Sequence, residues 1–169
     1  MALIIAKAAG ATTIITSSSD KKLERVKSEI GVDYTINYKT FPDWAAEVQR
    51  ITNGQGANQI IEISGVGTIL QSLNSVARAG VISVIGFLTT VSQDKMADVT
   101  MLTLIKGCIV RGVQGGSKQQ LEEAVNFIGS RELSVPVDKI FKFNRDDIIM
   151  GLKYLESGEH VGKVCINLD

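Results

Sequence analysis

Hydrophobic and polar positions follow two alternating patterns along this chain of 169 residues. Short apolar runs rich in β-branched residues, each bounded by glycine or polar turns, predict strands. The six runs of this kind are Thr12–Thr16, Tyr34–Tyr38, Gln59–Ile63, Val81–Phe87, Cys108–Val113 and Lys163–Leu168. Because the runs are nearly continuous, we expect strands buried on both faces, as in a parallel sheet with helices on either side.

Segments with helical spacing separate these runs. The clearest begins at Asp20 and places Leu23 and Val26 on one face, and a later one places Leu70 and Leu73 on its inner face. The expected helices are Asp20–Ile30, Pro42–Ile51, Thr68–Arg78, Met96–Lys106, Lys118–Ile128 and Asp146–Leu155. This alternation predicts an α/β fold with a doubly wound parallel sheet, in a single domain over residues 1–169.

Composition narrows the classes of partner. The 18 Lys and Arg residues balance the 18 Asp and Glu residues, so we expect binding neither to nucleic acid nor to an anionic membrane. The opening MALIIAKAAG lacks the length and basic start of a secretion signal, and no apolar stretch has transmembrane length. Cys108 and Cys165 lie singly, which predicts neither a zinc site nor a disulfide framework. We therefore expect a cytoplasmic protein.

Candidate chemistry lies where the first strand ends, in the segment ATTIITSSSDKK. Ser17 and Ser18 close an apolar strand, and Lys22 lies at the start of the following helix. Hydroxyls, backbone N–H groups and an ammonium at a sheet edge can hold the phosphorylated ribose of a dinucleotide. A 2′-phosphate beside an ammonium gains a charge-assisted contact that NAD cannot make. The alternative is that the serines and Asp20 only cap the helix and the lysine is solvated.

Six segments carry a resemblance to a known family through their order and spacing. They are AKAAGATTIITSSSDKKLERVK, INY, QIIEISGVGT, ARAGVISVIGF, RGVQGGSK and YLESGEHVGKV. Together they resemble the cofactor-binding half of zinc-type alcohol dehydrogenase-like proteins, in the medium-chain dehydrogenase/reductase superfamily that includes quinone oxidoreductases. In that family a strand and a Gly-rich turn precede the helix that resembles ALIIAKAAGA. The resemblance thus implies a Rossmann sheet lacking that first strand and turn, without the N-terminal catalytic domain and its zinc ligands.

The resemblance also implies a cofactor and its contacts. NAD-specific members carry an acidic residue where Ser17 stands, whereas Lys22 and Tyr38 match positions that meet a 2′-phosphate, so NADP is favoured over NAD. The other cofactor-binding positions that match the family are Ser64, Gly65, Ile85, Gly86, Phe87, Val113, Gln114, Gly115 and Lys163. Alternative interpretations are that Gly65 only forms a tight turn and that Lys163 is only solvated.

The activity implied is hydride transfer between NADP(H) and an alcohol, carbonyl or quinone-like substrate, with the chain alone catalytically incomplete. A noncatalytic dinucleotide-binding or interaction module derived from that family is the alternative. By the same resemblance, a second copy could associate through Cys108–Val113 and the segment VPVDKIFKF. We assign no catalytic residue: Glu62 is expected to pair with backbone or a lysine, and His160 is interpreted as a loop histidine after a helix.

Overall fold

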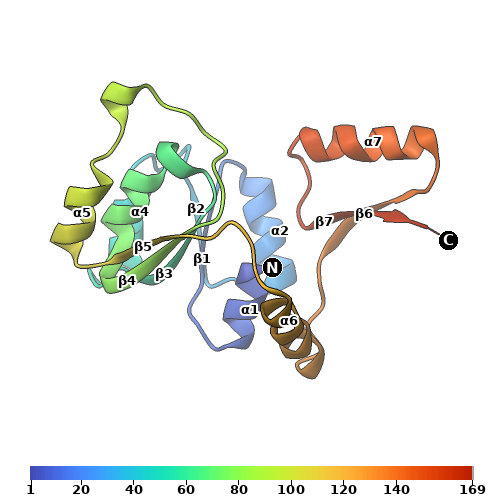
Figure 1. The fold of residues 1–169 in the computed structure, drawn as a ribbon, viewed down its shortest axis with the longest axis horizontal. Helices are drawn as coiled ribbons and strands as arrows, with labels where there is room; N and C mark the ends of the chain where they lie inside the picture. Colours follow the sequence, from blue (N-terminus) through green and yellow to red (C-terminus); the bar gives the residue numbers. More distant parts are fainter. Residues whose placement is uncertain (169) are drawn as a thin grey trace.

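The computed structural model describes residues 1–168, whose strands form three separate parallel sheets (Figure 1). The first sheet pairs β1 (Ile14–Ser17) with β2 (Tyr34–Asn37). The second has the order β3 (Ala57–Glu62), β4 (Val76–Val84), β5 (Ile109–Gly112). The third pairs β6 (Val137–Lys142) with β7 (Lys163–Asn167). The expected α/β class with parallel strands is confirmed.

Helices connect the strands, and most begin at a polar side chain that caps them. They are α1 (Ala2–Ala8), α2 (Asp20–Ile30), α3 (Trp44–Ile51), α4 (Ile69–Ser75), α5 (Val99–Lys106), α6 (Lys118–Ser130) and α7 (Arg145–Glu156), with 3-10 turns η1 (Gly65–Gly67) and η2 (Gln93–Lys95). Asp43 and Asn144, for example, each accept a hydrogen bond from a backbone N–H in the first turn of their helix. The predicted bounds of α2 are confirmed.

The prediction for the C-terminal part of the sheet is wrong. The run at Lys163–Leu168 does not join the main sheet but pairs, as β7, with β6. The prediction missed β6 because its sequence, VDKIFK, interleaves apolar residues with an aspartate and two lysines instead of forming an apolar run. Figure 1 shows β6, α7 and β7 as a unit that stands apart from the other strands. We call these elements, with the loops that join them, the C-terminal unit.

The helix expected over Thr68–Arg78 is also shorter than predicted. It ends at Ser75, and Val76 already pairs with Ala57 as the first residue of β4. Leu70 is 46% exposed, whereas Leu73 is fully buried, so only one of the two expected core leucines lies in the core. The other helices and strands begin or end a few residues from the predicted positions, as is usual where a helix frays or a cap decides its start.

The main core lies between α4 and one face of the three-stranded sheet. Its buried members are Ile69, Leu73, Val76, Ile82 and Cys108. On the opposite face, Ile61 is 47% and Ile109 is 55% exposed. Burial on both faces is therefore wrong for this sheet in the part of the chain that the structure describes. α2 packs on β1 and β2 instead.

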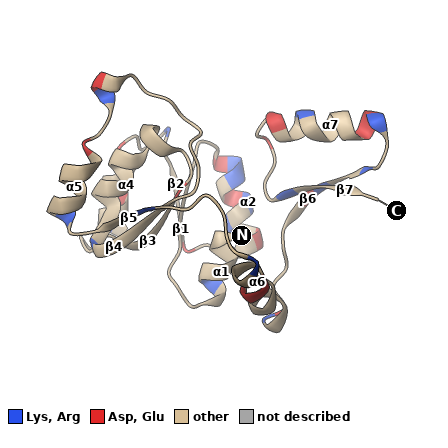
Figure 2. Ribbon diagram, in the orientation of Figure 1, with Lys and Arg blue, Asp and Glu red and all other residues tan. Residues whose placement is uncertain are grey.

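Charge is dispersed over this framework. Figure 2 shows acidic and basic residues interspersed along the helices, without a face of one sign. Among residues 1–168, no helix is long and apolar enough to cross a membrane. Most of the predicted site residues lie at carboxyl ends of strands, one group after β1 and β2 and another after β3, β4 and β5.

Candidate functional site

The carboxyl ends of β1 and β2 bring Ser17 and Tyr38 together. Ser17 is the last residue of β1, and Tyr38 directly follows β2. The backbone N–H of Tyr38 donates to the carbonyl of Ser17 at 3.0 Å. Tyr38 is 43% exposed, so its ring and hydroxyl are accessible to a ligand at this edge. The two positions that the resemblance assigns to the 2′-phosphate thus lie side by side, and their contact with a phosphate stays a prediction.

The three serines at positions 17–19 have different places in the structure: one caps α2, and the others lie at the end of β1. The expectation that Asp20 caps α2 is wrong: Ser19 is the N-cap, its hydroxyl accepts from the N–H of Lys22 at 3.4 Å, and Asp20 is the first residue of the helix. The Ser17 hydroxyl oxygen accepts from the N–H of Ser19 at 3.3 Å. Its hydroxyl proton can still be donated, because a hydroxyl is both donor and acceptor. Capping therefore accounts for Ser19 and leaves Ser17 and Ser18 available for a ligand.

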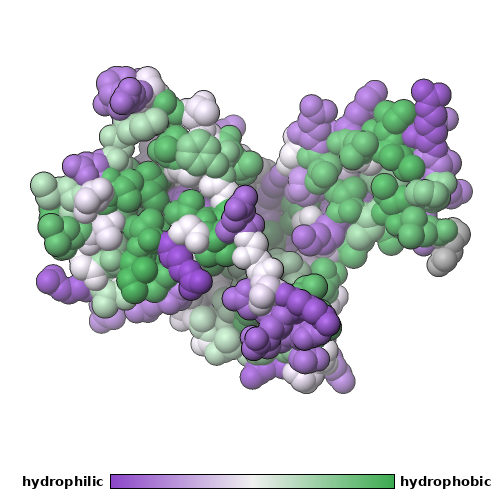
Figure 3. Space-filling model, in the orientation of Figure 1, coloured by the Kyte–Doolittle hydropathy of each residue, from purple (hydrophilic) through white to green (hydrophobic). Residues whose placement is uncertain are grey.

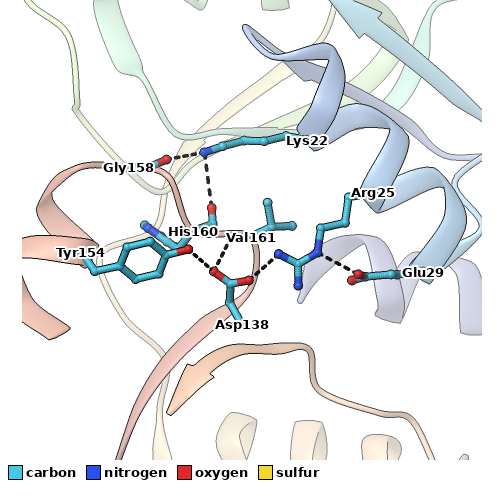
Figure 4. Close-up of polar contacts among 8 residues, drawn as sticks. All are labelled: Lys22, Arg25, Glu29, Asp138, Tyr154, Gly158, His160 and Val161. Carbon is cyan, nitrogen blue, oxygen red and sulfur yellow. Dashed lines mark hydrogen bonds and ion pairs between the residues drawn. The ribbon is translucent and has the colours of Figure 1, made fainter. Parts of the chain in front are cut away.

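Lys22 is not simply solvated. Its ammonium donates to the carbonyl of Gly158 and, at 3.3 Å, to that of His160, both in the loop after α7 (Figure 4). The interpretation of His160 as a loop histidine is confirmed. Its ring lies edge-on to Tyr154 with centroids 6.4 Å apart, and its buried Nδ1 has no hydrogen-bond partner among the described residues.

A second polar contact, centred on Asp138 of β6, also joins the C-terminal unit to α2 (Figure 4). The side chain of Asp138 is only 5% exposed. It accepts from the Arg25 guanidinium, from the Tyr154 hydroxyl at 2.6 Å and from the Val161 N–H at 3.3 Å. The Tyr154 hydroxyl, then the Arg25 guanidinium, lower the pKa of Asp138 to about 2.

Sequence reasoning missed this Asp138 cluster. Arg25 and Asp138 are separated by 113 positions, and neither belongs to a motif that the pattern of residues reveals. The one available signal was an aspartate at the start of a segment that alternates polar and apolar residues, and that signal does not identify a partner.

The turn after β3 is held by Glu62, which is 4% exposed. Its carboxylate accepts from the N–H groups of Ser64 at 2.9 Å and Gly65 at 3.1 Å. It also accepts from the hydroxyls of Thr68, at 2.6 Å, and Ser72. Glu62 therefore pairs with backbone and hydroxyls and not with a lysine. Its role is to shape the loop that carries the predicted contacts Ser64 and Gly65.

The turn after β4 packs closely on the turn after β3. A Cβ on Gly86 would lie 2.4 Å from the carbonyl oxygen of Ile63, so only glycine fits there. Gly65 has φ of +77°, and a Cβ there would lie 2.7 Å from the ring of Phe87. Gly65 thus forms a tight turn after β3, and its contact with a cofactor stays a prediction. Ile85 and Phe87 are 48% and 64% exposed and give this edge an apolar surface.

The remaining predicted positions divide between two places. Val113, Gln114 and Gly115 follow β5, and the N–H of Val113 donates to the carbonyl of Val84 at 2.9 Å, beside the turn after β4. Lys163 instead begins β7, in the separate sheet. Burial and then the charge of Lys163 lower the pKa of the Met1 amino group, so this lysine acts on the start of α1.

Two open hollows lie away from these strand ends. One, of about 630 Å³, is lined by residues that include Gln49, Asn74 and Arg78. The other, of about 510 Å³, lies where α1 and α2 meet the segment before β6. Within residues 1–168, no three His, Cys, Asp or Glu side chains gather as they would around a metal ion. The candidate site therefore lies at the strand ends, with hydroxyl and ammonium groups after β1 and β2 and apolar groups after β4.

Comparison with known proteins finds both a matching family model and similar individual proteins. A family model described as zinc-binding dehydrogenase matches residues 1–130. A zinc-type alcohol dehydrogenase-like protein of Schizosaccharomyces pombe is 37% identical over 169 residues, which cover 99% of this chain and 48% of that protein.

Solved structures show the same likeness. A Sinorhizobium meliloti protein provisionally described as an alcohol dehydrogenase has a TM-score of 0.86 and 36% identity, over 98% of this chain and 46% of that one. The crystal structure of an NAD-dependent alcohol dehydrogenase has a TM-score of 0.79 and 28% identity, over 99% and 47% of the two chains. The chain thus spans about half the length of the relatives that it matches.

Proposed function

The chain belongs to the zinc-binding dehydrogenase family, as the dinucleotide-binding, C-terminal half of medium-chain dehydrogenases and reductases, and we propose that it binds NADP(H) in preference to NAD(H). The observation that carries this proposal is the end of β1. A hydroxyl, Ser17, stands there beside Tyr38, and Lys22 lies in the first turn of the next helix. An acidic residue at that strand end would bond the ribose hydroxyls of NAD and repel a 2′-phosphate.

The fold alone does not choose between the two cofactors. A neighbour of the same fold is described as NAD-dependent, so the choice depends on side chains at the strand end. One carboxylate does lie close to this edge: Asp20 accepts a hydrogen bond from the Asn37 amide at 2.7 Å. The proposal treats Asp20 as the first residue of α2, where a negative charge stabilises the helix, and not as a ribose ligand.

We further propose that the parent activity is hydride transfer between NADP(H) and an alcohol, carbonyl or quinone-like substrate. In that role Ile85–Phe87 and Val113–Gly115 would flank the nicotinamide, and the exposed Phe87 ring fits a planar ligand. The cofactor supplies the redox chemistry, and this chain binds and orients it. Turnover would need a substrate-binding half, for which the relatives, about twice as long, have room.

Two substitutions test the cofactor assignment in opposite directions. Ser17→Asp should weaken the binding of NADPH about tenfold or more, because the new carboxylate repels the 2′-phosphate and a charge-assisted contact is worth about 1.5–3 kcal/mol. The affinity for NADH should stay the same or increase. Asp20→Asn, the matched control one residue outside the serine run, should leave the preference for NADPH intact or increase it. Both affinities would be measured by calorimetric titration of the purified chain. Equal losses for both cofactors in Ser17→Asp would refute the 2′-phosphate assignment.

A further inference from the structure

We infer that Asp138 is a positioning residue for cofactor choice: it fixes the turn at residues 158–161, whose carbonyls hold the ammonium of Lys22, a residue in the first turn of α2. This inference rests on the proposed function, because it gives the C-terminal unit a part in the 2′-phosphate site. The residues that match the family and suggested the 2′-phosphate site are Ser17, Lys22 and Tyr38, and none of them lies in β6 or α7.

The first step concerns the ammonium of Lys22. An ammonium has three N–H donors, and two of them are taken by the carbonyls of Gly158 and His160 (Figure 4). Both acceptors are neutral, so the positive charge is retained for an anion, with one N–H left to donate. A lysine held in this way has lost its side-chain freedom before the ligand arrives. Less ordering is then needed on binding.

The second step concerns what holds the two carbonyls in place. One oxygen of Asp138, Oδ2, accepts from the Tyr154 hydroxyl and from the N–H of Val161, the residue directly after His160. The other oxygen, Oδ1, accepts from Arg25, one turn along α2 from Lys22. A single buried carboxylate therefore connects α7, the 158–161 turn and α2. Loss of either side frees the turn to move relative to Lys22.

The third step excludes apolar packing as the main restraint on this turn. Among the described residues from 137 to 168, only Gly151, which has no side chain, is buried as a whole residue, and no apolar side chain is. Ile140 and Phe143 are each 66% exposed, and Figure 3 shows an apolar surface on the C-terminal unit. Directional polar contacts must therefore set the position of the turn, because there is little buried area to do so.

The test compares cofactor affinities in Tyr154→Phe, which removes the hydroxyl and keeps the ring. NADPH should bind about threefold to tenfold more weakly, with NADH changed less than about twofold, because only the phosphate contact depends on Lys22. In a Lys22→Met background, Tyr154→Phe should have no further effect on NADPH, since the residue through which it acts is gone. Arg25→Gln, which removes the Oδ1 partner, should give the same pattern independently.

Glu29→Gln is the matched control, because Glu29 bonds Arg25 at Nε, away from the Asp138 contact, and should leave the ratio of affinities unchanged. Thermal unfolding of each variant establishes that it is folded. The positioning role is wrong if Tyr154→Phe weakens both cofactors equally or acts undiminished in the Lys22→Met background. It is also wrong if NADPH binds more tightly, since the carbonyls would then compete with the phosphate. A Lys22→Met single variant that binds NADPH normally would instead refute the proposed phosphate site.

Discussion

The lobe around β3–β5 and the C-terminal unit are both parallel α/β structures, but they are held in different ways. In the first, Leu73 of α4 and Ile82 of β4 are both completely buried. In the second, Asp138 and Lys22 make the links to the rest of the chain through charged groups. Apolar burial is non-directional and gives a stable framework, whereas a few directional contacts fix one geometry and can be broken singly. The lobe around β3–β5 is thus the stable framework, and the C-terminal unit is the part whose position a single polar contact can change.

Removing a core side chain should have the largest effect. Leu73→Ala should lower the free energy of unfolding by about 2–5 kcal/mol, because it leaves a cavity under α4. The matched control is Leu70→Ala on the same helix, where the side chain is 46% exposed and the loss should stay below about 1 kcal/mol. Urea unfolding measures both. Similar losses at the two positions would contradict the assignment of the core to one face of α4.

Glu62→Gln should have the next largest effect, because the new amide group would face donors where the carboxylate accepted. We expect a loss of about 2–3 kcal/mol in the free energy of unfolding, typical of a buried charged acceptor removed from its partners. Hydrogen exchange at Ser64 and Gly65 should rise along with it. An unchanged stability with normal exchange at these amides would show that the carboxylate does not shape the turn.

Breaking the polar link should act locally. Asp138→Asn should speed hydrogen exchange in β6 and β7 by roughly an order of magnitude and leave β3 and β4 unchanged, as expected for a unit that opens on its own. Mass-spectrometric exchange on the purified chain resolves the two regions. Equal acceleration in both would mean that the C-terminal unit and the core unfold together, which contradicts the comparison.

Acid should produce the smallest and most local change. The folded-state pKa of Asp138 is lowered to about 2 from an ordinary value of 3.8, so its contribution to stability is complete above about pH 4 and is lost as the pH falls toward 2. The amide signal of Val161 should therefore titrate below pH 4 in NMR spectra.

Asp33, bonded to Lys7 at 2.9 Å and to the N–H of Thr13 at 2.7 Å, also has a pKa of about 2. Because it titrates in the same range, local signals are needed to separate the two carboxylates. In Asp138→Asn the Val161 titration should disappear while that of Thr13 persists. A Val161 signal that moves with its original midpoint in this variant would rule out Asp138 as its source.

The sequence pattern predicted the scaffold better than its attachments. Strands β1 to β5 and helix α2 follow from apolar runs and caps, and the parallel pairing of β1 with β2 then places Ser17 and Tyr38 at one edge. Burial on both sheet faces was wrong, because the pattern records apolar residues but not which helices cover them. The Asp138 cluster could not be predicted, since contacts between positions 25, 138 and 154 depend on the folded path of the chain.

The most direct test of the central claim is calorimetric titration of the purified chain with NADPH and then NADH, with circular dichroism on the same sample to establish that it is folded. We predict saturable binding of both, with NADPH at least about tenfold tighter, as expected for one charge-assisted phosphate contact. A folded chain that binds NADH as tightly as NADPH, or that binds neither, would contradict the account.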